Sequence, residues 1–231
     1  MSAAPATRDV ELGLLARFGP VAGMDEVGRG ALAGPVAVGV ALVDASVGEP
    51  PAGLTDSKAL TPRRREALCD PIRGWVCDAS VGYASPAEVD TFGITGALRL
   101  AGMRALVEIT GRGRMPGVVL LDGIHDWLTA PQADLFSQRR AVPTVPGVPQ
   151  VPVVTRVKAD LTCAVVSAAS VLAKVARDEV MTRMEDPGYD WAHNKGYASP
   201  SHVRALAQLG PCALHRRSWH LPGVADPAER A

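Results

Sequence analysis

Short apolar runs along the chain predict the strands of a sheet. They are rich in Val and are bounded by Gly, Pro and Asp, which is typical of strands. The first two runs are separated only by a turn from Gly28 to Pro35, which favours an antiparallel hairpin. The predicted strands are Val21–Val27, Val36–Val43, Trp75–Tyr83, Gly117–Leu121 and Val153–Val157.

Helices are predicted from their start signals and from the spacing of their apolar residues. Thr61 is the expected N-cap of a polar helix over Pro62–Asp70, with Pro62 at its first position. Ser85, Pro86 and Glu88 have the spacing of a capping box, and helical spacing continues to Ile109. The remaining predicted helices are the Ala-rich segment Leu161–Met184 and a short helix within Gly196–Leu209, with Ser199 as its N-cap.

The order of these elements predicts an α/β fold. Strands come first as a meander and then alternate with helices, which favours a mixed sheet with helices packed on it. Pro and Val alternate between Ala141 and Pro152, which predicts an extended loop or an edge segment. Because no repeat or long linker interrupts the pattern, we expect one domain over about 18–220. Residues 1–17 and 221–231 are expected to be terminal tails.

Composition narrows the class of protein. The chain has 231 residues, 47% of them apolar, which suffices for one large buried core. Lys+Arg and Asp+Glu balance at 24 each, so net charge gives no sign of a nucleic-acid partner, although a local basic patch would suffice to bind one. No apolar run reaches the ~18 residues of a membrane span, and the N-terminus lacks the pattern of a signal peptide. We therefore expect a cytoplasmic protein without a membrane partner.

The four cysteines also favour a cytoplasmic protein. They show neither a CxxC spacing nor nearby paired histidines, so neither a zinc site nor a disulfide framework is predicted. We interpret them as reduced thiols, mostly buried. They are Cys69, Cys77, Cys163 and Cys212.

Acidic residues at the ends of predicted elements are the candidate chemistry. Asp25 and Glu26 end an apolar strand, Asp122 ends another, and Asp160 lies between a strand and a helix. Ligands of open α/β sheets gather at the carboxyl ends of strands, so neighbouring strands would bring these carboxylates together. Oxygen ligands without His or Cys suit Mg²⁺ or Mn²⁺. Because successive strand residues face opposite sides, Asp25 and Glu26 could share a site only if the strand ended or bulged there.

Each of these acids also has a purely structural interpretation. Asp160 is a natural N-cap for the helix that follows it. Asp122-Gly123 is a common turn pair, and Asp56-Ser57 could form only an Asx turn. Arg216-Arg217, near the C-terminus, is of the kind that usually lies on a solvated face.

A second motif offers an alternative interpretation of the segment that follows the first strand. Gly28-x-Gly30-x-x-x-Gly34 after a strand is similar to a dinucleotide-binding fingerprint, which would indicate an oxidoreductase. A helix should then follow, but Pro35 and a Val-rich run follow instead. The acids before Gly28 would also repel a pyrophosphate. A cofactor-binding titration would separate this alternative from a metal-dependent enzyme.

Six segments in this order resemble a type 2 ribonuclease H, ribonuclease HII. The resemblance runs from about Val21 to Trp219, and the combination is specific although any one segment could be chance. The segments are AGMDEVGRGALAGP at 22–35, LTDSKAL at 54–60, LLDG at 120–123, KADLTCAVVSAASVLAKVARDEVM at 158–181, NKGYAS at 194–199 and GPCALHRRSW at 210–219.

The resemblance implies a fold, an activity and a site. It implies an RNase H-like mixed sheet flanked by helices, with a small helical C-terminal part at about 186–220. It implies an endonuclease that cleaves the RNA of RNA–DNA hybrids and nicks 5′ of single ribonucleotides in duplex DNA, as in ribonucleotide excision repair. Products would carry 5′-phosphate and 3′-hydroxyl ends. Two Mn²⁺ or Mg²⁺ ions would bind with substrate at the four metal-binding carboxylates, Asp25, Glu26, Asp122 and Asp160.

The same resemblance implies the substrate contacts. Gly28, Arg29 and Gly30 match a loop that reads the ribose 2′-hydroxyl largely through backbone groups, and this hydroxyl distinguishes RNA from DNA. Ser57 and Lys58 match a motif near the phosphates, and Arg29 and Lys58, with Arg216 and Arg217 as further candidates, would position the nucleic acid. Tyr197 matches a tyrosine that stacks on the sugar after the ribonucleotide.

Some features depart from the family pattern or leave a question open. Ala198-Ser199 stands where the family commonly has Gly-Thr, and Leu-Thr-Cys follows Asp160. These departures affect the fine shape of the sugar pocket and remove no catalytic group. A catalytically silent nucleic-acid binder is the remaining alternative, disfavoured because all four carboxylates are present. We expect a monomer, and nothing after Trp219 indicates docking on a sliding clamp.

Overall fold

The computed structural model describes residues 5–130 and 142–224. The expectations for residues 1–4, for Ala141 and for the end of the C-terminal tail at 225–231 lie outside the described residues.

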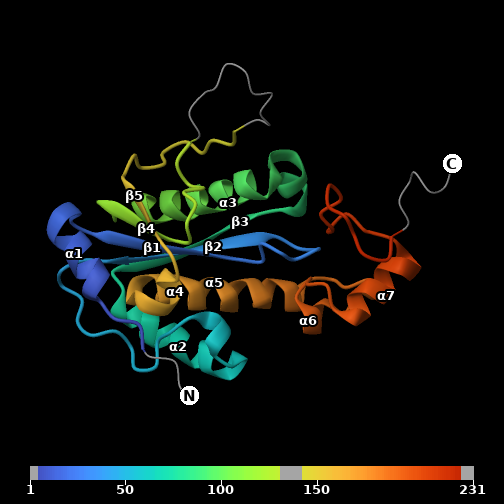
Figure 1. Ribbon diagram of the computed structural model, residues 1–231, viewed down its shortest axis with the longest axis horizontal. Helices are drawn as coiled ribbons and strands as arrows, with labels where there is room; N and C mark the ends of the chain where they lie inside the picture. The colour runs from blue at the N-terminus through green and yellow to red at the C-terminus, as the bar shows by residue number, and fades with distance from the viewer. Residues whose placement is uncertain (1–4, 131–141, 225–231) are drawn as a thin grey trace.

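A single five-stranded mixed sheet forms the centre of the molecule (Figure 1). Its strand order is β3-β2-β1-β4-β5, with β1 antiparallel to β2, β2 antiparallel to β3, and β1, β4 and β5 parallel. The meander of the first three strands and the mixed character of the sheet were both predicted from the sequence. The strands are β1 Val21–Val27, β2 Val36–Val43, β3 Asp78–Ala84, β4 Val118–Asp122 and β5 Val153–Arg156.

Helices cover both faces of the sheet. Helix α3 (Pro86–Gly111) lies on one face, and α5 (Ala164–Arg183) lies on the other, with α2 (Pro62–Trp75) outside α5 (Figure 1). Separate apolar clusters fill the two sides of the sheet, one against α3 and one against α5. Helix α5 approaches very closely because Gly39 on β2 has no side chain: a Cβ there would lie 2.2 Å from the Ala169 carbonyl oxygen.

The predicted helix starts at Thr61, Ser85 and Ser199 are confirmed, whereas the helix predicted over Leu161–Met184 is interrupted by the extended Cys163 and becomes α4 (Ala159–Thr162) and α5. The Thr61 hydroxyl accepts a hydrogen bond from the Arg64 amide at the start of α2, and Ser85 and Glu88 form a reciprocal capping box at the start of α3. The Ser199 hydroxyl accepts from the His202 amide and begins α7 (Pro200–Leu209). The third strand begins at Asp78 rather than at Trp75, because α2 continues through Trp75.

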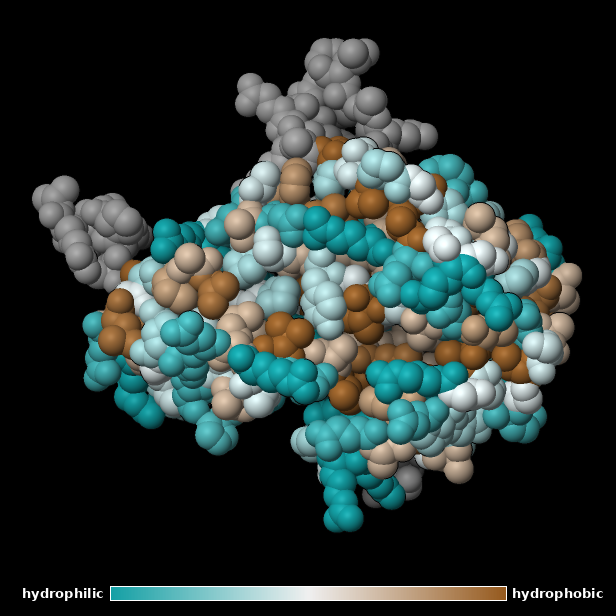
Figure 2. Space-filling view, turned by 180° about the vertical axis from the view of Figure 1, so that it is seen from behind, coloured by the Kyte–Doolittle hydropathy of each residue, from teal (hydrophilic) through white to brown (hydrophobic). Residues whose placement is uncertain are grey.

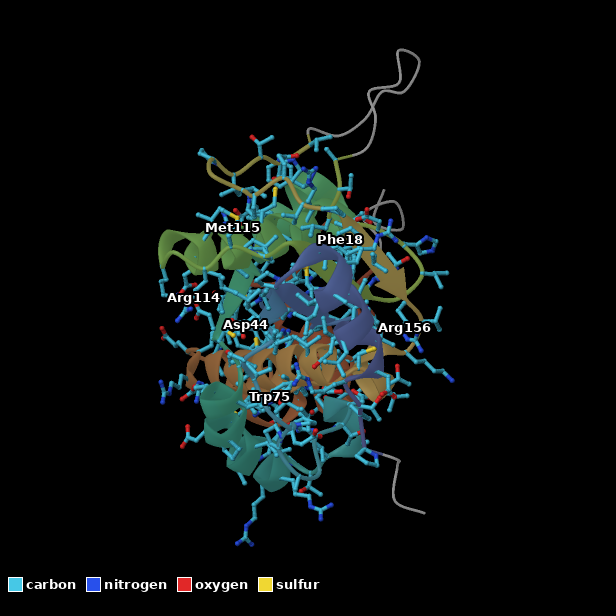
Figure 3. All side chains as sticks on the ribbon, turned by 90° about the vertical axis from the view of Figure 1, so that its left-hand side faces the viewer. Phe18, Asp44, Trp75, Arg114, Met115 and Arg156 are labelled. Carbon is cyan, nitrogen blue, oxygen red and sulfur yellow. The ribbon has the colours of Figure 1, made fainter. Side chains whose placement is uncertain are left out.

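The segment expected as an N-terminal tail contains a helix. Helix α1 (Asp9–Phe18) covers one end of the sheet between the layers of α3 and α5, as the end-on view shows together with Phe18 (Figure 3). It carries a buried carboxylate, Glu11, that accepts a hydrogen bond from the Val165 amide at 2.9 Å and one from Arg8 at 2.6 Å. These tertiary contacts hold the segment against the domain.

A small unit follows α5, at the end of the molecule opposite α1 (Figure 1). It comprises α6 (Trp191–Asn194), α7 and the segment that follows. It has its own apolar cluster around Trp191 and Leu206, which also includes Leu32 and Ala33 from the turn after β1. The unit is therefore attached directly to the loop that follows β1.

Two surface observations complete the description. On the face shown in Figure 2, apolar residues are interspersed with polar ones. No helix in the described ranges has both the length and the apolar character needed to cross a bilayer.

Candidate active site

The register of the parallel strands brings two predicted acids together. Met24 on β1 pairs with Leu121 on β4, so Asp25 and Asp122 are the next residues on adjacent strands. Both lie at the carboxyl ends of the paired segments, where α/β sheets bind ligands. The prediction that neighbouring strands would gather these carboxylates is confirmed for this pair.

Asp25 is the most buried of the predicted acids. It is 3% exposed and lies on the face of β1 that α5 covers, beside Ser170. Burial, together with the negative charges of Glu26 and Asp122, raises the pKa of Asp25 to about 8, against the opposing effects of Ser170 and Lys58. The structure thus holds a carboxyl group where its ionised form lacks sufficient positive charge nearby.

Asp160 joins this group through backbone and charge. The Asp122 carboxylate accepts hydrogen bonds from the amides of Ala159 (2.7 Å) and Asp160 (3.3 Å), which draws the start of α4 (Ala159–Thr162) to the end of β4. Burial raises the pKa of Asp160, and so do the charges of Asp122 and Asp56. Asp160 lies in the first turn of α4, whereas Lys158 occupies the N-cap position, so the capping interpretation is wrong.

Lys58 is a cation beside Asp160. Its Nζ lies 3.5 Å from Asp160 Oδ2, and its side chain is 75% exposed. Although partial burial lowers the pKa of Lys58, the charges of Asp56, Asp25 and Asp160 raise it overall. The Asp56 carboxylate accepts from the Lys58 amide at 3.0 Å, which confirms the Asx-type turn, and the Ser170 hydroxyl donates to the Ser57 hydroxyl at 2.9 Å. Lys58 is thus held at the mouth of the acidic group.

Glu26 lies on the opposite face of the strand. The expectation that β1 ends or bulges between Asp25 and Glu26 is wrong: its register with β2 is regular through Val27. Pairing with β4 stops after Met24, so the edge of β1 facing β4 is open beside Glu26. The Glu26 carboxylate accepts from Arg29 Nη1 at 3.1 Å. We call Asp25, Glu26, Asp122 and Asp160 the acidic cluster.

The acidic cluster suits a hard divalent cation in its chemistry, although its atoms are not arranged as a finished site. All of its donors are carboxylate oxygens, which Mg²⁺ and Mn²⁺ prefer. Across residues 5–130 and 142–224, no three His, Cys, Asp or Glu side chains are placed as a ready-made metal site. Like charges repel one another, and Mg²⁺ binds through few carboxylates together with substrate phosphates. The raised pKa of the buried Asp25 is the observation that fits a cation here.

Loop 28–30 follows β1 directly beside the acidic cluster. Gly28 has φ +81°, and a Cβ on it would lie 2.1 Å from Arg177 Nε, so only glycine fits this position. Arg29 and Gly30 are exposed. A ligand could therefore reach the backbone of Arg29 and Gly30, which the predicted close approach requires.

Arg216 is buried, not solvated. It is 0% exposed, and its guanidinium donates to the carbonyl oxygens of Gly28 (2.6 Å), Arg29 (2.7 Å) and Gly34 (3.4 Å). Burial and the neighbouring charge of Arg177 lower the pKa of Arg216 to about 9, so it stays charged at neutral pH. Its burial excludes a direct contact with nucleic acid, whereas Arg217 is exposed.

Known proteins match this chain over most of its length. The model of the family described as ribonuclease HII matches residues 22–221. A ribonuclease HII from Streptomyces avermitilis is 44% identical over 219 residues, covering 93% of this chain and 84% of the relative. The chain belongs to the ribonuclease HII family. It is a ribonuclease H, an endonuclease of a family that depends on divalent metal ions and acts on RNA–DNA substrates.

Solved structures of the family share the fold. The ribonuclease H2 of Pyrococcus horikoshii is 27% identical with a TM-score of 0.60, covering 87% of this chain and 94% of that one. The ribonuclease HII of Archaeoglobus fulgidus, solved in a complex with PCNA, is 25% identical with a TM-score of 0.61, covering 86% of this chain and 93% of that one. The predicted RNase H-like fold is confirmed.

Tyr197 stands where the small C-terminal unit meets loop 28–35. Its side chain is on the surface, and the residue is 36% exposed. Its ring lies over two cations, with Arg177 Cζ 5.5 Å and Lys174 Nζ 5.7 Å from the ring centroid. The Tyr197 carbonyl faces His202 Nδ1 at 2.9 Å. Arg177, Lys174 and His202 therefore contact Tyr197 from the protein side, while its ring stays accessible to a ligand.

Sequence reasoning missed the side chains that hold these substrate residues. Arg177 donates to the carbonyl oxygens of Pro35 (2.8 Å), Lys195 (3.0 Å) and Ala33 (3.3 Å). His202 Nε2 meets His215 Nε2 at 3.0 Å, both side chains being buried. We call Arg177, Arg216, His202 and His215 the basic cluster. Its one available signal was an arginine inside the apolar helix at 164–183.

Proposed function

We propose that this ribonuclease HII nicks duplex DNA 5′ of single ribonucleotides and also cleaves longer RNA–DNA hybrids, as in ribonucleotide excision repair. Asp25, Asp122 and Asp160 are the proposed ligands of two Mg²⁺ or Mn²⁺ ions that bind with the substrate. Glu26 is the proposed fourth ligand, reached at the edge of β1 that is left open where pairing with β4 ends. The observation that carries this proposal is the buried Asp25, whose pKa of about 8 reflects burial beside Glu26 and Asp122. The ionised form of such a group is stabilised by added positive charge, which a divalent metal ion would bring.

The protein residues would act by positioning charge and substrate. When bound, divalent ions supply Lewis-acid charge for an in-line phosphoryl displacement and make bound water easier to deprotonate. Asp122 would keep its ligand orientation because two amides hold one of its oxygens. Lys58, exposed beside Asp160, would meet a backbone phosphate, as would Arg29 beside Glu26. The side chains of Lys58 and Arg29 would then each interact with one carboxylate and one phosphate.

Substrate choice is assigned to loop 28–30 and Tyr197. Gly28, Arg29 and Gly30 would approach the ribose closely, with the 2′-hydroxyl as the group recognised. The Tyr197 ring would stack on the sugar that follows the ribonucleotide. Ser57 lies buried behind Lys58 and would hold it in place, because its carbonyl and hydroxyl are bound by Arg65 and Ser170.

The test compares labelled duplexes that differ in one 2′-hydroxyl. A DNA duplex with a single ribonucleotide and a matched all-DNA duplex are incubated with Mg²⁺, with Mn²⁺ or with chelator. The proposal requires a metal-dependent nick on the 5′ side of the ribonucleotide only, leaving 3′-hydroxyl and 5′-phosphate ends. A folded protein that nicks neither duplex with either metal would instead be the silent binder.

A further inference from the structure

Two carbonyl groups of loop 28–30, those of Gly28 and Arg29, turn toward one buried side chain. Arg216 donates to the carbonyls of Gly28 and Arg29, and Gly28 also accepts from the Ala31 amide. Arg216 reaches this loop from the far end of the chain, across 188 residues in the case of Gly28. Two hydrogen bonds from one planar guanidinium determine the orientation of two successive peptide groups.

That orientation determines where the amides point. In a trans peptide the C=O of one residue and the N–H of the next point in opposite directions, and every peptide bond of this chain is trans within the described residues. Turning the Gly28 carbonyl inward therefore turns the Arg29 N–H outward, and the Arg29 carbonyl does the same for the Gly30 N–H. Neither amide donates to any atom of residues 5–130 or 142–224, and both residues are exposed.

A charge beneath the loop strengthens these donors. Successive outward N–H groups form a concave site for an electron-rich oxygen. The Arg216 guanidinium polarises the same two peptide groups from behind, which makes their N–H groups better donors. Arg177 keeps the loop beside Tyr197, because it binds the carbonyls of Ala33 and Pro35 on one side and of Lys195 on the other.

We propose that Arg216, assisted by Arg177, is a positioning residue for ribose recognition: it presents the Arg29 and Gly30 amides as paired donors to an acceptor oxygen of the ribonucleotide. Arg216 itself touches no substrate. The inference rests on the proposed function for the identity of the ligand, and it adds the residue that prepares the loop.

The experiment uses Arg216→Lys and Arg216→Gln, with Arg204→Ala as the matched control. Lysine keeps the charge but cannot bind two carbonyls as a planar fork. Arg204 is an exposed arginine on α7, in the same C-terminal unit. Binding is measured with chelator present, so that no cleavage occurs, as the ratio of affinities for the single-ribonucleotide duplex and the all-DNA duplex. Nicking is measured in parallel as kcat and KM.

The expected result is a loss of ribose preference. Each Arg216 variant should lower kcat/KM on the single-ribonucleotide duplex by about 30-fold or more, as for removal of an oriented donor, and its binding ratio should fall toward that of a protein blind to the 2′-hydroxyl. Arg204→Ala should keep the binding ratio and kcat/KM of the wild type. A third variant, Arg216→Ala, tests rescue: guanidinium ion added below its denaturing concentration should restore nicking, whereas methylammonium should not.

Two outcomes would overturn the inference. One is a folded Arg216 variant with the binding ratio of the wild type. The other is loss of folding in both Arg216 variants, which would assign the residue to stability. A wild-type protein that nicks nothing would refute the proposed function, while the binding ratio under chelator would still decide this inference.

Discussion

The basic cluster is buried, whereas the acidic cluster is buried at Asp25 and Asp160 and partly exposed at Glu26 and Asp122, and the two are built in opposite ways. In the basic cluster, each guanidinium is matched by backbone carbonyls, and the two histidines by each other and by a carbonyl. In the acidic cluster, the deepest carboxyl group lies beside other carboxylates, and its pKa is raised to about 8 by burial. Arg216 Nε alone among the polar side-chain atoms of the basic cluster is buried without a partner in the described residues. Buried groups matched by backbone partners stabilise a shape, whereas a carboxyl group left against like charge is available to a ligand.

The largest expected effect falls on the acidic cluster. Asp122→Asn keeps the size of the side chain and an oxygen for the Ala159 and Asp160 amides but removes its charge. We expect nicking of the single-ribonucleotide duplex to fall on the order of a thousandfold, with the thermal midpoint nearly unchanged. The measurement is kcat with Mg²⁺ and with Mn²⁺, beside circular dichroism. Full activity in a folded variant would remove Asp122 from the site.

Asp25→Asn should separate activity from stability. The folded-state pKa is raised from 3.8 to about 8, so the stability tied to the bound proton is present below pH 3.8 and is lost as the pH rises through 8. An amide cannot ionise, so the variant should be more stable at pH 7 by up to about 4 kcal/mol, while nicking is lost. Chemical denaturation with chelator measures this. Equal stability of variant and wild type would show that the fold does not disfavour the ionised form of Asp25.

The histidines of the basic cluster should give the opposite pH trend. His202 Nδ1 donates to the Tyr197 carbonyl, so its Nε2 accepts from His215 Nε2, and His215 Nδ1 accepts from the Cys212 amide at 3.2 Å. This series of hydrogen bonds requires one nitrogen of each ring to carry no proton, because a proton on that nitrogen would point at another donor. Burial and the neighbouring His202 lower the pKa of His215 to about 4.

The sign of the His215 contribution follows from that shift. Above pH 6.5 both folded and unfolded states are neutral and the contribution is complete. As the pH falls from 6.5 toward 4, the unfolded state gains a proton first, which destabilises the fold by up to about 3 kcal/mol. His215→Gln should flatten this part of the stability profile, and His220→Gln, at an exposed histidine, should leave it as in the wild type. Parallel profiles for all three proteins would contradict the neutral pair.

The sequence was informative where local rules decide and silent where distant contacts decide. The capped starts at Thr61, Ser85 and Ser199 needed only neighbouring residues. Asp25 and Asp122 were found because acids at strand ends are expensive without a ligand, and their meeting needed only that the strands be neighbours. Helix α1 was missed although Val10, Leu14 and Phe18 have helical spacing, because its buried Glu11 is matched by Val165, far along the chain.

The burial of Arg216 could not be predicted either. Local sequence places it in an Arg-Arg pair, which usually lies in solvent, and its carbonyl partners are at Gly28, Arg29 and Gly34. A charged side chain is buried only when the fold supplies such partners. The regular pairing of Glu26 with Val38 was unexpected for the same reason, since the need for a bulge was argued from one strand alone.

The smallest effect is expected at Tyr197, where the basic cluster reaches the surface. Its backbone is held by His202 and its ring lies over Arg177, so removing the ring should leave the scaffold intact while removing a stacking surface. Tyr197→Ala should lower kcat/KM on the single-ribonucleotide duplex by about 10-fold, in line with one lost stacking contact, and less on a long RNA–DNA hybrid. Tyr197→Phe, which keeps the ring, should stay near the wild type on both. Equal losses on the two substrates in Tyr197→Ala would mean that the ring contributes general affinity, and selection of the junction would then rest with loop 28–30 alone.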